Sequence, residues 1–251
     1  MEVKAEKINP YDNSRCKTEQ VQEMFDSIAP AYDFMNRAMT FGIDKLWRAK
    51  AVKILSSHAP KSILDVATGT GDLAIKLAKE LKPDKIVGID LSQGMIEIGR
   101  SKVADAGLDR KIELVQGDCL DLPLPDDEFD CVTVAYGVRN FEHLSQGYQE
   151  MLRVLRPGGM LCVIELSTPT SPLVKPLYKF YTRYIIPAVG RMVSKDVRAY
   201  SYLPESIAAV PQGNDMLRLM QDAGFVDCRF KALTFGTCTI YTAYAPRRVF
   251  R

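Results

Sequence analysis

The sequence lacks the runs and clusters that mark membrane-spanning, metal-binding and disulfide-stapled proteins. None of its segments approaches the roughly 18 consecutive apolar residues of a membrane-spanning helix, and residues 1–10 hold no apolar signal region. The six cysteines form no CxxC pair and the two histidines stand apart, so no metal-ligand spacing is present. We therefore expect a cytoplasmic protein with reduced cysteines and no resident metal.

The net charge is small but unevenly placed. A net charge of +2 is too small to indicate a nucleic-acid partner. Residues 101–130 nevertheless carry nine acidic and three basic side chains, whereas residues 171–200 carry six basic and one acidic. The basic segment 171–200 is therefore a candidate surface for contact with a negatively charged partner.

Apolar runs alternate with amphipathic stretches from residue 61 onward. This alternation predicts a parallel sheet built from strand–helix–strand units. The runs are continuous, as ILDVA and IVGID show, which is expected where helices cover both faces of the sheet. The expected strands are 62–67, 85–90, 112–117, 129–135 and 160–166, followed by a helix at 214–224 and an antiparallel pair at 226–233 and 237–245.

No repeat, low-complexity tract or interdomain linker divides the chain, so we expect a single domain over 1–251. An N-terminal helical cap should occupy 1–60, with its helical segment 18–57 broken at Pro30. The core should occupy 61–166, a proline- and tyrosine-rich lid insertion 167–213, and the closing helix and strands 214–251.

A glycine-rich loop, Asp65-Val-Ala-Thr-Gly-Thr-Gly-Asp72, follows the first expected strand. Ligands of open parallel sheets bind at such carboxyl ends, and Gly69 and Gly71 allow a sharp turn with close backbone approach. The segment 69–74 also fits a dinucleotide fingerprint that ends in alanine, so a nicotinamide-dependent oxidoreductase is one interpretation.

The charges at the two ends of this loop favour another ligand. Asp65 and Asp72 would repel a dinucleotide pyrophosphate. S-adenosylmethionine has no phosphate and carries a sulfonium and an ammonium group, both of which favour nearby carboxylates. We therefore predict that the loop binds this methyl donor.

Two further strand ends fit the same ligand. Asp90 closes the second strand, where a carboxylate can accept hydrogen bonds from both ribose hydroxyls, as it also does in dinucleotide binders. Asp118 and Cys119 close the third, where a methyltransferase contacts adenine; a simple turn at Asp118 is the alternative. Leu155-Arg-Pro-Gly-Gly159 is expected to form the turn before the fifth strand.

Several motifs, most of them outside the cofactor core, carry a resemblance to a known enzyme family. They are residues 65–72 and 129–130, Phe25-Asp-Ser-Ile-Ala-Pro-Ala-Tyr-Asp33, Met35-Asn36, Phe41-Gly-Ile43 with Leu46-Trp47, Tyr136-Gly-Val-Arg-Asn140, and Tyr200 with Tyr202-Leu-Pro-Glu-Ser-Ile207. In them the chain closely resembles, over nearly its whole length, the ubiquinone/menaquinone biosynthesis C-methyltransferase family, which includes demethylmenaquinone methyltransferases.

The resemblance implies a class I S-adenosylmethionine-dependent methyltransferase with a Rossmann-like, mostly parallel seven-stranded sheet. It implies cofactor contacts at Thr70, Asp90, Asp118 and Cys119, with Gly69 and Gly71 shaping the loop beside Asp65. One departure is Thr68, where many relatives have glycine, which is expected to narrow the site slightly.

The resemblance implies a prenylated quinol as the acceptor, with demethylmenaquinol favoured and a 2-methoxy-6-polyprenyl-1,4-benzoquinol as the alternative. A sterol or phospholipid-amine acceptor is disfavoured by the motifs 136–140 and 200–207. A noncatalytic cofactor-binding scaffold of a quinone-biosynthesis complex, and a homodimer, are left open.

Methyl transfer to such a ring is an in-line displacement that needs a nucleophilic carbon. A quinone carbon is electrophilic, so the substrate should be the quinol, whose hydroxyl loses a proton. Arg139 is the first candidate to stabilise the resulting phenolate, with a water carrying the proton. His143 and Asp33 are alternative groups for this step, and Tyr32 and Tyr200 are expected at the substrate.

The segment 173–186 is both aromatic and basic. It could lie on an anionic membrane surface, with Lys175, Lys179 and Arg183 facing lipid phosphates. The alternative is a lid packed on the edge of the sheet with its basic side chains in water, and the two are compatible.

Overall fold

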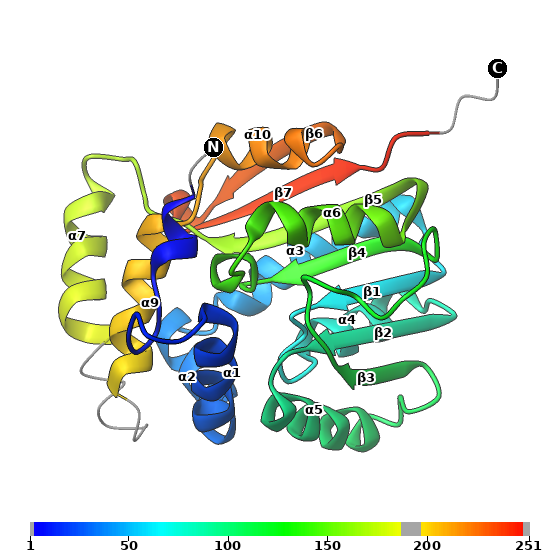
Figure 1. Ribbon diagram of the computed structural model, residues 1–251, viewed down its shortest axis with the longest axis horizontal. Helices are drawn as coiled ribbons and strands as arrows, with labels where there is room; N and C mark the ends of the chain where they lie inside the picture. The colour runs from blue at the N-terminus through cyan, green and yellow to red at the C-terminus, as the bar shows by residue number, and fades with distance from the viewer. Residues whose placement is uncertain (1–2, 187–196, 248–251) are drawn as a thin grey trace.

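A computed structural model describes residues 3–186 and 197–247, without the side chains of Val197 and Tyr200. Its centre is a seven-stranded sheet in the order β3-β2-β1-β4-β5-β7-β6 (Figure 1). The strands are β1 (Ser62–Val66), β2 (Lys85–Asp90), β3 (Ile112–Gln116), β4 (Phe129–Ala135), β5 (Leu155–Leu166), β6 (Val226–Leu233) and β7 (Cys238–Tyr244).

The strand order reverses next to β1, which pairs in parallel with β2 on one side and β4 on the other. β7 is antiparallel to both β5 and β6. Such a reversal leaves a crevice at the carboxyl ends of the strands, where ligands of open α/β sheets bind. The predicted mostly parallel sheet with a closing antiparallel pair is therefore confirmed.

Helices cover both faces of the sheet, as the continuous apolar runs predicted. Leu64 and Val66 of β1 pack in one core cluster with α6 (Leu144–Val154) and α10 (Asn214–Asp222). Ile63 packs in a second cluster with α3 (Asp44–Leu55), α4 (Asp72–Leu81) and α5 (Gln93–Asp105). Successive β1 side chains point to opposite faces, which is why every position in ILDV is buried.

The N-terminal cap is broken where predicted and at one more place. Pro30 lies in a 3₁₀ turn (Ala29–Ala31) that separates α1 (Lys17–Ile28) from α2 (Tyr32–Thr40). A second break, before α3, occurs at Phe41 and Gly42, whose φ angles are 51° and 74°. An aromatic residue rarely adopts this left-handed conformation, so no local pattern predicted the break.

The predicted turn at 155–159 is instead part of β5. Leu155 pairs with Phe129, and the next paired residues are Met160 and Cys131, so residues 156–159 form an irregular bulge opposite Asp130. Arg156 donates to the Asp130 carboxylate at 2.6 Å, which ties the bulge to β4. The prediction of a separate turn was wrong, because β5 pairs with β4 both before residues 156–159, at Leu155, and after them, from Met160.

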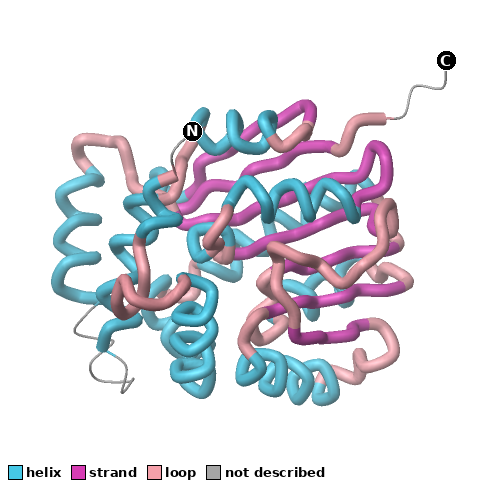
Figure 2. The backbone as a smooth tube through the Cα atoms, viewed as in Figure 1, coloured by secondary structure: helices cyan, strands magenta, loops and turns pink. Residues whose placement is uncertain are grey.

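The insertion contains α7 (Val174–Phe180), a π-helical turn (Tyr181–Ile185) and α9 (Val197–Ala209). Figure 2 shows these helices, with α1 and α2 of the cap, at one end of the sheet, on the left of the view. Among the residues described, no helix is long and apolar enough to cross a bilayer, and no group of His, Cys, Asp and Glu could hold a metal ion.

Candidate active site

A pocket with about 670 Å³ of empty space lies at the carboxyl ends of the strands next to the reversal of strand order. Four of the predicted cofactor residues line it: Gly69, Asp90, Asp118 and Cys119. They come from the loops after β1, β2 and β3, which are far apart in sequence but adjacent in the sheet.

Asp90 is the central charged group of this pocket. Its Oδ2 accepts from the Gly69 backbone N–H at 2.7 Å and its Oδ1 from the Ser92 N–H at 3.0 Å. Burial raises the pKa of this carboxyl to about 6, although these backbone hydrogen bonds oppose the shift. Further hydrogen-bond donors, such as the two hydroxyls of a ribose, would stabilise the charged form of this buried carboxylate.

The other predicted cofactor residues support the loop from behind the pocket. Asp65 accepts from Thr68 Oγ1 at 2.7 Å and Thr133 Oγ1 at 2.6 Å, and burial raises the pKa of its carboxyl to about 6. The Thr70 hydroxyl donates to Asp33 at 2.6 Å. Asp65, Thr70 and Gly71 are absent from the lining of the pocket.

Asp118 and Cys119, the two residues predicted to contact adenine, both line this pocket. Asp118 Oδ1 accepts from the Leu120 N–H at 2.9 Å, so the residue also makes the turn that was the alternative interpretation. Burial raises the pKa of the Cys119 thiol well above its ordinary value, so it stays protonated. A neutral thiol leaves its backbone N–H as the polar group available to a ring nitrogen.

The cap covers this pocket. Thr18, Val21 and Phe25 of α1 and Tyr32 of α2 contribute to its lining. Only Tyr32 was predicted among these four, and it was predicted at the substrate. The motif from Phe25 to Asp33 was the available signal for Phe25, and no motif contained Thr18 or Val21.

A second, larger cavity adjoins the first. It holds about 1250 Å³ of empty space, and Tyr32 and Tyr136 line both cavities. Its walls are mainly apolar and come from the cap and the insertion, including Met39, Leu177 and Ile207. The arrangement suits a flat polar group next to the cofactor and an apolar extension that runs away from it.

Arg139 lines this second cavity and is buried. Its Nη1 donates to Glu165 Oε1 at 2.8 Å and to the Tyr136 carbonyl. Burial alone would lower the pKa of the guanidinium, but Glu165, Tyr32 and Tyr202 together outweigh it and the pKa is raised. Arg139 is therefore a fixed cation, and a direct role as a base is excluded.

Unpartnered polar atoms gather beside this cavity. Over the described part of the chain, the buried side-chain nitrogen and oxygen atoms without a hydrogen-bond partner are Arg48 Nε, Tyr136 Oη and Arg139 Nε. The Arg48 guanidinium lies 5.4 Å from the centre of the Tyr136 ring. Because buried polar groups are almost always paired, these three atoms are available to bind water or a polar ligand.

The structure places two further candidates from the sequence, His143 and Asp33, outside the lining of both cavities. His143 is an exposed residue before α6 and lines neither cavity. Tyr200 belongs to α9, but its side chain lies outside the described residues. Asp33 is near the cavities but is bonded to Thr70 and Lys102.

Comparison with known proteins decides the family. A model of the ubiE/COQ5 methyltransferase family matches residues 13–245. The chain belongs to this family. The chain is 48% identical to the demethylmenaquinone methyltransferase of Bacteroides fragilis, covering 97% of this chain and 99% of the relative. It is 44% identical to the ubiquinone/menaquinone biosynthesis C-methyltransferase UbiE of Geobacter sulfurreducens, covering 96% and 94%.

Solved structures confirm the fold of this family member as a class I S-adenosylmethionine-dependent methyltransferase. The [4+2]-cyclase SpnF superposes with a TM-score of 0.66 at 17% identity over 92% of this chain and 97% of that one. Phosphoethanolamine N-methyltransferase 2 of Haemonchus contortus, solved with S-adenosyl-L-methionine, gives 0.60 at 14% identity over 79% and 53%. Since one of the two is named as a cyclase, this likeness fixes the architecture and not the reaction.

Proposed function

We propose that this protein transfers a methyl group from S-adenosylmethionine to a ring carbon of a prenylated quinol, demethylmenaquinol, and so forms menaquinol. The observation that carries the proposal is the large apolar cavity next to the cofactor pocket, with unpartnered polar atoms of Tyr136 and Arg139. A prenylated quinol matches this cavity, because its two ring oxygens can pair with the polar atoms and its long tail can occupy the apolar space.

The residues of the first pocket fit the methyl donor. Asp90 would accept from the ribose hydroxyls, Asp118 from the adenine amino group, and the Cys119 N–H would donate to an adenine nitrogen. The bound cofactor supplies an activated methyl group on a sulfonium. The pocket contributes alignment, and the cap residues Phe25 and Tyr32 exclude water from it.

The acceptor must be the reduced ring, since a quinone carbon does not act as a nucleophile. Loss of a hydroxyl proton makes the neighbouring carbon nucleophilic, and the positive charge of Arg139 lowers the pKa of that hydroxyl. Because Glu165 keeps Arg139 protonated, the hydroxyl proton must leave to another acceptor, for which we propose water. After methyl transfer the hydrogen on the methylated carbon leaves as a proton and the ring oxygen is protonated again, which restores the aromatic quinol. The unpartnered Tyr136 Oη and Arg139 Nε would pair with the ring oxygens.

The same cavity offers a route for the tail and a surface that suits a membrane. Phe41 and Leu177 line the cavity and are exposed, at 77% and 75%. Leu173, Leu177, Phe180 and Tyr184 are all more than half exposed and follow a helical spacing along α7 and the turn after it. Lys175, Lys179 and Arg183 are exposed on the same segment. We propose that this segment contacts the cytoplasmic face of an anionic membrane, where the substrate resides.

The experiment compares two acceptors under reducing conditions. Purified protein is incubated with labelled S-adenosylmethionine and either demethylmenaquinol or 2-methoxy-6-polyprenyl-1,4-benzoquinol, and label in the ring is followed by mass spectrometry. The proposal predicts faster methylation of the naphthoquinol. Faster methylation of the benzoquinol would reassign the pathway, and cofactor binding without methylation of either would favour the scaffold.

A further inference from the structure

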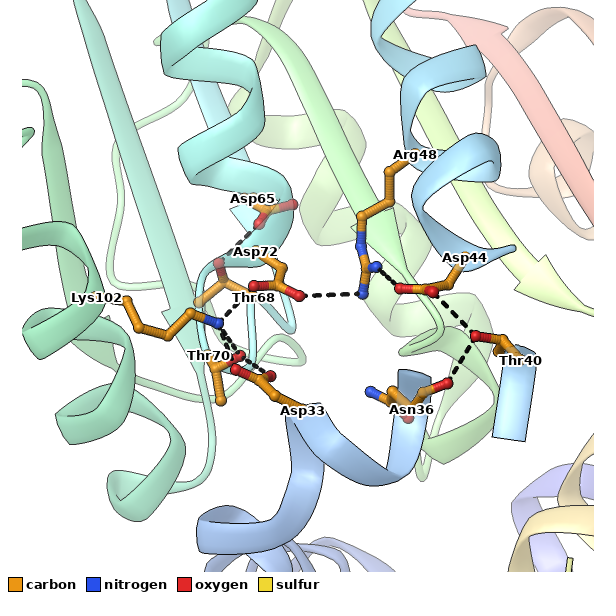
Figure 3. Close-up of polar contacts among 10 residues, drawn as sticks. All are labelled: Asp33, Asn36, Thr40, Asp44, Arg48, Asp65, Thr68, Thr70, Asp72 and Lys102. Atoms are coloured by element: carbon orange, nitrogen blue, oxygen red, sulfur yellow. Dashed lines mark hydrogen bonds and ion pairs between the residues drawn. The ribbon is translucent and has the colours of Figure 1, made fainter. Parts of the chain in front are cut away.

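Lys102 of α5 joins three separate elements at the edge of the cofactor loop (Figure 3). Its Nζ donates to Asp33 Oδ2 of α2 at 2.6 Å and to the Thr70 hydroxyl of the loop at 2.9 Å. It also donates to the carboxylate of Asp72 in the first turn of α4. A single cation therefore ties the cap helix α2 to the loop and to two helices of the core.

The network holds α2 at both of its ends (Figure 3). Asp33 anchors its first turn through Lys102. At its last residue, Thr40 donates to Asp44 at 2.9 Å, and Asp44 is ion-paired with Arg48. Arg48 in turn lies 3.9 Å from Asp72, which closes the chain of charges back to Lys102. No motif of the sequence had linked these residues.

Tyr32 depends on this network for its position. It precedes Asp33 in the chain and lines both cavities. A Cβ built on Gly69 would lie 3.7 Å from Tyr32 Cε1, so the ring lies beside the cofactor loop with only the space of a missing side chain between them. Holding Asp33 against Thr70 therefore holds Tyr32 over the cofactor pocket.

Besides this network, Tyr181 of the insertion donates to the Met39 carbonyl of α2, and α1 has attachments of its own. Asp26 accepts from Ser92 Oγ and from the Gly94 N–H at 2.9 Å. Glu142 accepts from both the N–H and the hydroxyl of Thr18. Release of α2 would therefore uncover the loop side of the pocket while α1 stays attached.

We propose that Lys102 is a positioning residue that latches α2 over the cofactor pocket, and that the latch must open before the demethylated cofactor leaves. The proposal rests on the proposed function in taking S-adenosylhomocysteine as the product. The three charged side chains are 24–28% exposed, so ions in solution reach them and screen the pairing. Release should accordingly be faster at higher ionic strength.

The test measures dissociation of labelled S-adenosylhomocysteine from the full-length protein after rapid dilution. Lys102→Met and Asp33→Asn should each raise the dissociation rate about tenfold, equivalent to ~1.4 kcal/mol, and abolish its increase with salt. Lys102→Arg should keep a rate close to that of the unsubstituted protein. The matched control is Lys76→Met, which removes one lysine–glutamate pair on α4, with Glu80, and should leave the rate unchanged.

The outcomes separate the latch from the proposed reaction. Folded Lys102→Met and Asp33→Asn proteins that release the product at the original rate would overturn the latch, whether or not the quinol is methylated. Faster release together with no methylation of any quinol would keep the latch and reject the acceptor. If the unsubstituted protein does not bind S-adenosylhomocysteine, both proposals fail.

Discussion

Glu165, near the end of β5, fixes both the side chain and the backbone of Arg139. Its Oε1 accepts from Arg139 Nη1 at 2.8 Å, and its Oε2 accepts from the Arg139 N–H at 3.3 Å. Both residues are buried, and the pair leaves Arg139 Nε unpartnered beside the second, larger cavity, called here the acceptor cavity. The cation is therefore held before the substrate arrives, which is how electrostatic stabilisation becomes effective.

Replacing Arg139 should affect the chemical step more than cofactor binding. Arg139→Ala is expected to lower kcat on the quinol by about 10²-fold, the range found when one charge-stabilising donor is removed. The dissociation constant of S-adenosylmethionine should stay within about twofold, because Arg139 does not line the cofactor pocket. Arg218→Ala, an exposed arginine of α10, is the control. Unchanged turnover of the Arg139→Ala protein would remove Arg139 from the mechanism.

Removing one member of the buried Arg139–Glu165 pair should destabilise the protein, because the other member keeps its charge without a partner. Glu165→Ala is expected to lower the free energy of unfolding by about 3 kcal/mol or more, because it leaves a buried guanidinium without its counter-ion. The measurement is urea unfolding at equilibrium. The double substitution Arg139→Met with Glu165→Ala should lose less than the sum of the single losses, and strict additivity would contradict this account.

Tyr136 and Tyr148 provide a matched comparison of two buried hydroxyls. Tyr136 Oη has no partner and its residue lines the acceptor cavity, whereas Tyr148 Oη contacts Met216 Sδ at 3.0 Å inside the core. Tyr136→Phe should raise KM for the quinol several-fold without loss of stability, since no protein hydrogen bond is removed. Tyr148→Phe should leave KM unchanged. Equal KM values for both variants would mean that the Tyr136 hydroxyl does not bind the ring.

Cofactor affinity should depend on pH through Asp90. Its pKa of about 6 in the free protein means that the carboxyl is protonated below that pH, and a protonated group accepts hydrogen bonds less well. The dissociation constant of S-adenosylmethionine should rise as the pH falls below about 6, as calorimetry can show. Asp90→Asn should bind more weakly and lose that dependence.

Asp65 is the control for this titration. Burial raises its pKa to about 6 as well, but it does not line the pocket, so Asp65→Asn should retain the pH dependence of cofactor binding. Because folding raises the pKa of Asp65, this residue also makes stability depend on pH. Its contribution to the free energy of unfolding is fully present below its ordinary pKa of 3.8 and is lost as the pH rises through about 6. Loss of the pH dependence in the Asp65→Asn protein would transfer the role from Asp90 to Asp65.

Membrane contact should depend on the exposed face of α7. The double substitution of Leu177→Asp and Phe180→Asp places two negative charges among exposed apolar residues, and should abolish cosedimentation with anionic liposomes. Binding of the unsubstituted protein should weaken with salt because Lys175, Lys179 and Arg183 contribute. Phe235→Asp, which changes an exposed residue outside this segment, is the control. Equal binding of all three proteins would reject α7 as the contact.

The sheet was predictable from the sequence because its signals are local. Continuous apolar runs and the glycine loop lie within single segments. Arg139 was also found, through the motif that contains it. Glu165 was not, because an acidic residue at the end of an apolar strand does not reveal its partner 26 residues earlier.

The charges around the glycine loop show what local reasoning misses. Asp65 and Asp72 were interpreted through their attraction to a cationic cofactor. In the structure Asp65 is bonded to two threonines, and Asp72 pairs with Lys102 and Arg48. Those partners come from distant segments, so the sequence pattern could not show how far each charge is already compensated. The acceptor cavity, built between the cap and the insertion, was hidden for the same reason.

The central claim is that a reduced ring, bound between the cap and the insertion, receives the methyl group on carbon. The most direct measurement supplies labelled S-adenosylmethionine with demethylmenaquinol kept reduced and, separately, with the same molecule kept oxidised, and locates the label by mass spectrometry. We predict label on a ring carbon with the reduced acceptor and none with the oxidised one. Label on an oxygen, equal labelling in both redox states, or cofactor binding with no labelling would contradict the account.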